Sequence, residues 1–118
     1  MHKIFFSYTL KDGNVSKDFL LNLRLWTKNQ GVDSYIDILD NDYNEKEFQK
    51  KLESILRKCD TFCKIDSELY DTSKWTKKEV QVAKQHKLNY FTYSPNELKK
   101  FLIQNYNVKS VFQIQQSS

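Results

Sequence analysis

The sequence predicts an α/β domain in which a doubly wound parallel sheet carries helices on both faces. Short apolar runs rich in strand-forming residues alternate with segments of roughly ten to sixteen residues that have helical spacing. This alternation is typical of βαβ units, whose crossovers are right-handed and whose strands are parallel. Two Gly and one Pro among 118 residues are few for an all-β protein, which needs many tight turns. We therefore expect one domain over residues 1–118, with four to five strands in the flavodoxin-like order 2-1-3-4-5.

The first strand and the first helix are predicted from residues 3–30. Residues 3–8 form a short apolar run, and the turn cluster at 11–14 ends it. A helix over residues 15–30 follows, because apolar residues recur there at helical spacing: Val15, Phe19, Leu23 and Trp26. Gly31 stands where the C-cap of this helix is expected.

The middle of the chain repeats the strand–helix order. Residues 33–39 are expected to form the second strand, and an acidic stretch then leads into a helix over residues 45–58. One face of that helix is apolar: Phe48, Leu52, Ile55 and Leu56. Residues 61–65 are expected to form the third strand, and residues 67–72 a loop.

The last part of the chain adds two helices and two strands to the prediction. A helix over residues 73–87 precedes a fourth strand over residues 88–93. The motif Ser-Pro-Asn-Glu at 94–97 opens a further helix with two signals, a proline at the first helical position and a capping box. Residues 108–114 are expected to add a fifth short strand, and residues 115–118 a frayed tail.

The charge of the chain is unevenly distributed. The formal net charge is +4. Residues 1–44 hold five basic and six acidic residues. Residues 45–118 hold fourteen basic and nine acidic residues, so the positive charge lies in this second part. A basic half can mark a nucleic-acid partner, but no recognisable binding motif accompanies these lysines. We interpret them as a solvated surface, and a nucleic-acid partner is not expected.

Cysteine and histidine usage points to a reduced, metal-free protein. If Cys59 and Cys63 shared one strand, they would lie roughly 13 Å apart, which is too far for a disulfide. His2 and His86 have no companion ligands at metal spacing. The sequence shows no signal peptide and no apolar run of membrane-spanning length. We therefore expect a cytoplasmic protein with no membrane partner, no metal and no resident cofactor.

A functional site is expected at the carboxyl ends of the central strands. Open parallel sheets bind ligands where the strand order reverses, which for the order 2-1-3-4-5 is between strands one and three. The loops at residues 7–14 and 66–73 would flank this crevice, and the helix over residues 73–87 begins beside them.

Glu79 is the candidate for chemistry at this crevice. At about 100° per residue it shares one helical stripe with four other side chains: Trp75, Val82, Ala83 and His86. The lysines of this helix lie on its other side. A carboxylate within the stripe must be paired, neutral or facing a cavity, because burying it alone is too costly. The structural alternative is a Glu79 at the edge of the stripe, paired with a lysine.

Several other chemistries fit the sequence badly. Phosphoacceptor receiver domains have this fold, and Asp66 does follow the third strand. Such domains carry an acidic pair after the first strand, where this chain has Ser7-Tyr8-Thr9. There is no Walker loop, no glycine-rich dinucleotide motif and no plausible Ser/His/Asp set.

Two segments carry motifs that occur together in one family. Residues 5–12 read Phe-Phe-Ser-Tyr-Thr-Leu-Lys-Asp, and residues 60–67 form a strand that ends in Asp-Ser. The second segment is followed by Tyr70, Ser73, Trp75 and Glu79. The first motif resembles the hydrophobic strand and Ser-Tyr-Ser-x-x-Asp of TIR (Toll/interleukin-1 receptor) domains, with Thr9 in place of a Ser. The second resembles their third strand, followed by Tyr and Ser-x-Trp-x-x-x-Glu. The resemblance covers roughly residues 3–93, without the glycine usual before the second helix.

This resemblance to bacterial TIR-like proteins implies an activity and a set of site residues. Many such domains cleave NAD⁺ at the nicotinamide–ribose bond, by hydrolysis or cyclisation, with the glutamate that corresponds to Glu79 as the catalytic residue. A carboxylate suits this role because it stabilises an oxocarbenium-like ribosyl centre. NAD⁺ would be a substrate and not a cofactor. The substrate-binding residues implied are Phe6, Ser7, Tyr8, Asp12, Ser67, Tyr70 and Trp75.

The resemblance also implies partners and leaves other functions open. TIR domains contact each other, so a homo-oligomer or another TIR domain is expected, in signalling or antiphage defence. A non-enzymatic interaction module is the first alternative, and it predicts a Glu79 paired with lysine and no pocket near Ser7. A nucleoside deoxyribosyltransferase-like enzyme is the second, because that class has the same fold and a glutamate on the helix after a strand.

Overall fold

The computed structural model of the chain describes residues 2–41 and 47–115, except for the side chains of residues 48 and 49. Four strands form one parallel sheet: β1 (Lys3–Ser7), β2 (Asp33–Ile36), β3 (Thr61–Ile65) and β4 (Asn89–Tyr93). Their order is β2-β1-β3-β4. The predicted fold class and the predicted order of the first four strands are therefore confirmed.

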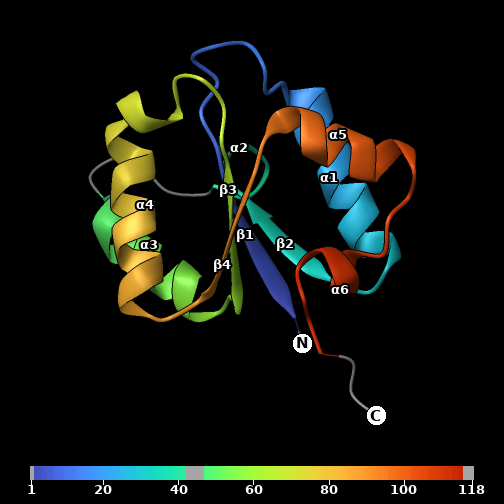
Figure 1. Cartoon of the computed structure of the whole chain (residues 1–118). Coiled ribbons are helices and arrows are strands. Elements are labelled where there is room, and N and C mark those ends of the chain that lie inside the picture. Colours follow the sequence, from blue (N-terminus) through green and yellow to red (C-terminus); the bar gives the residue numbers. More distant parts are fainter. Residues whose placement is uncertain (1, 42–46, 116–118) are drawn as a thin grey trace.

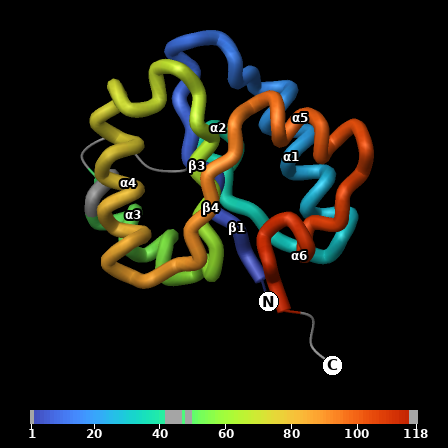
Figure 2. The backbone as a smooth tube through the Cα atoms, in the orientation of Figure 1, coloured from blue at the N-terminus to red at the C-terminus, as the bar shows by residue number. Residues whose placement is uncertain are grey.

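Helices cover both faces of this sheet, as Figures 1 and 2 show. One layer holds α3 (Phe48–Arg57) and α4 (Lys74–Gln85). The other layer holds α1 (Lys17–Asn29), α5 (Pro95–Ile103) and α6 (Val108–Val111). Two single turns lie at the carboxyl end of the strands: α2 (Asp37–Asp40) and the 3₁₀ helix η2 (Tyr70–Thr72). Within the described residues, no helix is both long and apolar enough to cross a membrane.

A row of aromatic side chains crosses all four strands beneath α3 and α4. The register pairs Phe5 with Tyr35 and with Phe62, and pairs Phe62 with Tyr90. Consecutive rings in this row are stacked, with centroids 5.2, 5.5 and 5.3 Å apart. Cross-strand aromatic pairs stabilise a sheet, so this row fixes the register of all four strands.

Phe112 is the central residue of the core on the opposite face. It is fully buried, and its ring meets the edges of Phe6, Phe91 and Tyr93 at centroid distances of 6.0, 5.7 and 5.8 Å. The segment after α5 therefore packs across the sheet, although it adds no strand to it.

Local signals in the sequence set the ends of the helices. The Ser16 hydroxyl accepts a hydrogen bond from the Phe19 N–H, so α1 begins directly after Ser16. At the start of α5, Ser94 and Glu97 form the predicted capping box. The C-cap residue of α1 is Gln30, one position before the predicted Gly31. Gly31 follows it with a φ of 75°, the left-handed conformation common directly after a helix C-cap.

The second strand is shorter than predicted. It ends at Ile36, and α2 follows where residues 37–39 were expected to continue the strand. The Asp40 carboxylate accepts a hydrogen bond from the Ile36 N–H at 2.8 Å and also pairs with the Arg24 guanidinium. These contacts turn the chain back on itself, so the run of β-forming residues does not stay extended.

The predicted fifth strand over residues 108–114 is wrong, because this segment begins with the short helix α6. The Asn107 side chain accepts a hydrogen bond from the Ser110 N–H and caps that helix. Gln113 then takes a φ of 50°, which no strand residue adopts. Apolar residues here recur at both strand and helix spacing, and such a short run does not distinguish the two.

Two predictions concern residues that the structure leaves out. The predicted tail overlaps residues 116–118, which lie outside the described part of the chain. On the predicted apolar face of α3, Leu52 and Leu56 are buried, whereas the side chain of Phe48 is not described.

Candidate active site

Three side chains from three segments meet at the carboxyl end of β1. The Ser7 hydroxyl lies 2.7 Å from Glu79 Oε1, to which it donates a hydrogen bond. The Tyr70 hydroxyl lies 2.6 Å from Ser7 Oγ. Since Ser7 has one hydroxyl proton and gives it to Glu79, Tyr70 donates to Ser7. The result is a directed chain of hydrogen bonds from Tyr70 through Ser7 to the Glu79 carboxyl group.

Strand geometry explains why Ser7 faces α4. Side chains alternate along a strand, so Ser7 lies on the same face of the sheet as Phe5, towards α3 and α4. β1 pairs with β2 on one side and with β3 on the other. The strand order reverses beside β1, so this is the predicted crevice position.

Glu79 lies on the buried side of α4, as the helical spacing predicts. It is 7% exposed, and Val82 and Ala83 on the same stripe are also buried. The Ser73 hydroxyl caps α4 by accepting a hydrogen bond from the Thr76 N–H, and this sets where the helix begins. Among the described residues no lysine forms an ion pair with Glu79. The structural alternative of a surface pair is therefore not what the structure shows.

The environment of Glu79 favours its neutral form. Burial raises the pKa of its carboxyl group from 4.5 to about 8, against the lowering effect of the Ser7 hydrogen bond. The negative charge of Asp37 adds to the increase. Burial also raises the pKa of the Tyr70 phenol, so Tyr70 stays protonated and remains a donor. A carboxyl group with a pKa near neutrality can give or take a proton under ordinary conditions.

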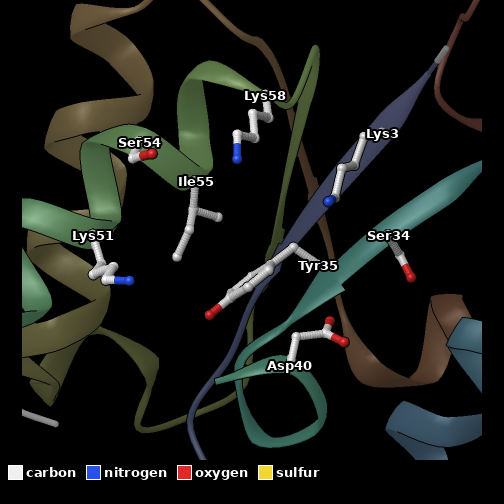
Figure 3. A pocket seen from close by; sticks show the side chains of 8 residues that line it. All are labelled: Lys3, Ser34, Tyr35, Asp40, Lys51, Ser54, Ile55 and Lys58. Carbon is white, nitrogen blue, oxygen red and sulfur yellow. The ribbon is translucent and has the colours of Figure 1, made fainter. Parts of the chain in front are cut away.

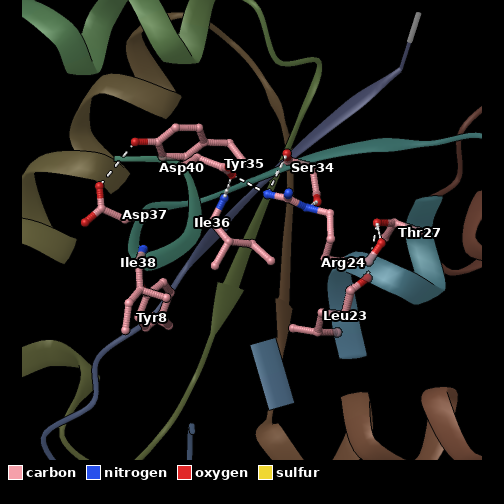
Figure 4. Close-up of polar contacts among 10 residues, drawn as sticks. All are labelled: Tyr8, Leu23, Arg24, Thr27, Ser34, Tyr35, Ile36, Asp37, Ile38 and Asp40. Atoms are coloured by element: carbon pink, nitrogen blue, oxygen red, sulfur yellow. Dashed lines mark hydrogen bonds and ion pairs between the residues drawn. The ribbon is translucent and has the colours of Figure 1, made fainter. Parts of the chain in front are cut away.

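Asp37 is a residue of this site that the sequence analysis missed. It was assigned to the second strand, but it begins α2 at the carboxyl end of β2, on the same edge of the sheet as Ser7. The Tyr35 hydroxyl donates a hydrogen bond to Asp37 Oδ1 at 3.2 Å, and Figure 4 shows the two side chains pointing towards each other. A carboxylate directly after a strand was the signal that could have identified it.

Tyr8 lies on the rim next to this residue. Its hydroxyl accepts a hydrogen bond from the Ile38 N–H at 2.8 Å, also drawn in Figure 4, and so joins the loop after β1 to α2. The Tyr8 side chain is half-buried, and its burial raises the pKa of its phenol. The charges of Asp37 and Glu79 raise that pKa further, so both carboxyl groups are close enough to act on Tyr8.

Asp12 joins the loop after β1 to the loop after β3. Its carboxylate accepts hydrogen bonds from the Leu69 N–H at 2.9 Å and from the Asn14 N–H at 3.1 Å. The Leu69 bond is the main reason why the pKa of Asp12 is lowered. Ser67 is buried in the loop after β3. Its hydroxyl has no hydrogen bond of normal geometry to any described residue. The Ser67 side chain still helps to lower the pKa of Asp12. Asp12 thus holds the two loops together.

Two of the implied binding residues, Phe6 and Trp75, lie outside the buried group around Glu79. Phe6 is buried on the opposite face of the sheet, against Phe112, so the structure does not bring its side chain to the crevice. Trp75 is 44% exposed, so it does not belong to the buried stripe of α4 with Glu79. A ligand contact for Trp75 stays a prediction.

The polar groups that meet at the site are the Ser7 and Tyr70 hydroxyls and the Glu79 carboxyl group. Within the described residues, no group of three or more His, Cys, Asp or Glu side chains could hold a metal ion. Two hydroxyl groups and a buried carboxyl group can orient a sugar and respond to positive charge on it.

Comparison with known proteins identifies a fold neighbour but no family. No family model matches the sequence, and no curated protein matches it. Among solved structures, the chain is similar to the CMP N-glycosidase BcmB of Clostridium botulinum, with a TM-score of 0.57. The two chains are 17% identical, over 89% of this chain and 83% of that chain. At this identity the likeness shows a shared α/β fold.

Proposed function

We propose that this protein cleaves the N-glycosidic bond of a nucleotide, with Glu79 as the carboxyl group beside the reacting ribose. The observation that carries the proposal is the buried Glu79, hydrogen-bonded by Ser7 at the crevice position of the sheet. A buried carboxyl group with a raised pKa at the carboxyl ends of the central strands is typical of functional sites. The fold likeness to a CMP N-glycosidase and the TIR-like motifs support the same class of reaction.

In the proposed reaction the bond between C1′ of the ribose and the base nitrogen breaks, and the base takes the electron pair. Positive charge develops on C1′ and the ring oxygen, and the Glu79 carboxylate stabilises that charge. Water then forms the new bond to C1′ and releases a proton. The hydroxyls of Ser7 and Tyr70 hold Glu79 in place.

NAD⁺ and CMP require different protonation states of Glu79. Nicotinamide leaves NAD⁺ as a neutral molecule and needs no proton, and its positive ring favours an ionised Glu79 in the complex. Cytosine leaves CMP as an anion unless an acid protonates it, and a protonated Glu79 could supply that proton. The TIR-like motifs favour NAD⁺, and the fold neighbour makes CMP the second substrate to test.

The test is to incubate concentrated protein with NAD⁺ or with CMP and to follow the released base by chromatography. A crowding agent is included because TIR-like enzymes act as assemblies. We expect release by the wild type and a loss of about 100-fold or more in Glu79→Gln, as expected for a group that stabilises transition-state charge. The matched control is Glu68→Gln, which makes the same chemical change on an exposed side chain near the site.

Each outcome leads to a different conclusion. Release of nicotinamide alone supports the TIR-like reaction, and the second product shows hydrolysis or cyclisation. Release of cytosine alone supports a nucleotide hydrolase, and transfer of the sugar to an added free base supports the deoxyribosyltransferase-like alternative. If the folded wild type releases neither base, or if Glu79→Gln retains full activity, the proposal is wrong.

A further inference from the structure

A cavity of about 400 Å³ lies between the sheet and α3, outside the site of Glu79. It is lined by Lys3, Ser34, Tyr35, Asp40, Lys51, Ser54, Ile55 and Lys58. Figure 3 shows these side chains around one space, with the residues of α3 on one side and those of β1, β2 and α2 on the other. Its volume falls within the range of small-molecule sites.

Positive charge predominates in the lining. Lys51 lies on α3, and Lys58 is the C-cap residue directly after it. The two are seven residues apart, about two helical turns, so they lie on one side of this segment, and Lys3 faces them from β1. None of these three lysines forms an ion pair within the part of the chain that the structure describes. The carboxylate in the lining, Asp40, is already held by Arg24 and by the Ile36 N–H. The three ammonium groups are therefore available to an anionic ligand.

The cavity also has an apolar wall. One face of the Tyr35 ring stacks on Phe5, with centroids 5.2 Å apart. Tyr35 and Ile55 both line the cavity, from the sheet and from α3 respectively. Tyr35 is 6% exposed, so Ile55 offers most of the apolar contact to the organic part of a ligand whose charge meets the lysines.

The lining of this cavity does not include the hydrogen-bonded residues around Glu79, although the Tyr35 hydroxyl bonds to Asp37. Ser7, Tyr70 and Glu79 are not among its lining residues. Lys3 and Ser7 are the first and last residues of β1, roughly 13 Å apart at about 3.3 Å per residue. The cavity therefore extends from Lys3, at the amino end of β1, to Asp40 of α2, after the carboxyl end of β2, without including the three residues around Glu79.

We propose that this cavity binds a phosphate monoester of nucleotide size, with the three lysines on the phosphate and with Tyr35 and Ile55 against the organic part. Lysine binds phosphate as a point charge through strong, charge-assisted hydrogen bonds. The site does not depend on the proposed reaction, and its occupant is a second ligand and not the molecule that is cleaved at Glu79.

The test is a titration followed by the backbone amide signals of the isotope-labelled protein in NMR. The Glu79→Gln variant is used, so that any change reports binding and not turnover. AMP, inorganic phosphate and adenosine are titrated separately at low salt. We expect saturable shifts at the amides of Lys3, Ser34, Lys51 and Lys58 with AMP, weaker binding of phosphate and none of adenosine.

Matched charge reversals test the role of the lysines. The double variant Lys51→Glu/Lys58→Glu should bind AMP about tenfold more weakly or worse, since hydrogen bonds to charged groups contribute on that order. Lys100→Glu/Lys109→Glu makes the same change in charge on the other layer and should bind like the parent. Equal losses in both double variants, or no saturable shifts with AMP, would overturn the proposal. Equal affinity for phosphate and AMP would overturn the role of Tyr35 and Ile55.

Discussion

At the scale of single residues, Glu79 makes the stability of the fold depend on pH. Its pKa is raised from 4.5 to about 8, so the folded state binds a proton more tightly than the unfolded state. The protonated group contributes most below pH 4.5, and that contribution is lost as the pH rises to 8. The loss is up to about 5 kcal/mol, because one pKa unit corresponds to about 1.4 kcal/mol.

We therefore expect Glu79→Gln to change this pH dependence. Thermal unfolding between pH 5 and 9 should show the wild type losing stability across that window, while Glu79→Gln loses clearly less. Glu68→Gln, on an exposed side chain, should follow the wild type. If the melting curves of Glu79→Gln and the wild type fell in parallel, Glu79 would not be the buried neutral group described above.

Ser7 is predicted to tune the pKa of Glu79. Its hydrogen bond to Glu79 Oε1 lowers that pKa, so Ser7→Ala should raise it and move the titration of Glu79 to higher pH. The Tyr70 hydroxyl would lose its Ser7 partner, so a stability loss of about 1–3 kcal/mol is also expected. Carboxyl carbon shifts in NMR measure the titration directly. Thr92→Ala, at an exposed position on β4, is the control and should leave that titration unchanged.

At the scale of elements, the two crevice loops are predicted to act as one unit through Asp12. Asp12→Ala removes the acceptor for the Leu69 N–H, so hydrogen exchange at that amide should become faster while the sheet amides keep their protection. The pKa of Asp12 is lowered below 3.8, so its stabilising contribution is present above that pH and is lost on acidification. Exchange in the wild type should therefore approach that of the variant at low pH. An unchanged Leu69 amide in Asp12→Ala would show that other contacts hold the loops together.

The elements that the sequence predicted best are those with local signals. The capping box at Ser94 and the apolar spacing of α1 depend on neighbours in sequence, and both are found in the structure. The end of β2 was missed because it depends on Asp40 and Arg24, which lie on different elements. The position of Glu79 followed from helical spacing alone, whereas its bond to Ser7, 72 residues away in sequence, required the fold.

At the scale of the whole molecule, the sheet separates Ser7 and Glu79 from the aromatic cluster around Phe112. Ser7 and Glu79 face the layer of α3 and α4, while Phe112 and its aromatic neighbours lie on the other face. Trp26 from α1 also meets Phe112, with ring centroids 6.1 Å apart. Phe112, directly after α6, thus joins α1 to the sheet on the face opposite Ser7 and Glu79.

This separation predicts that stability and activity can be changed independently. Phe112→Ala should lower the free energy of unfolding by about 3–5 kcal/mol, because it opens a cavity among side chains that cannot close it. Under conditions where the variant stays folded, its rate of base release per folded molecule should equal that of the wild type. Urea unfolding gives the first quantity, and the base-release assay gives the second. Phe101→Leu, at a half-buried position on the same side, is the milder control and should lose less stability. A large fall in the rate per folded molecule would mean that the core beneath Phe6 and Phe112 positions Ser7 through β1, and that the two faces of the sheet are coupled.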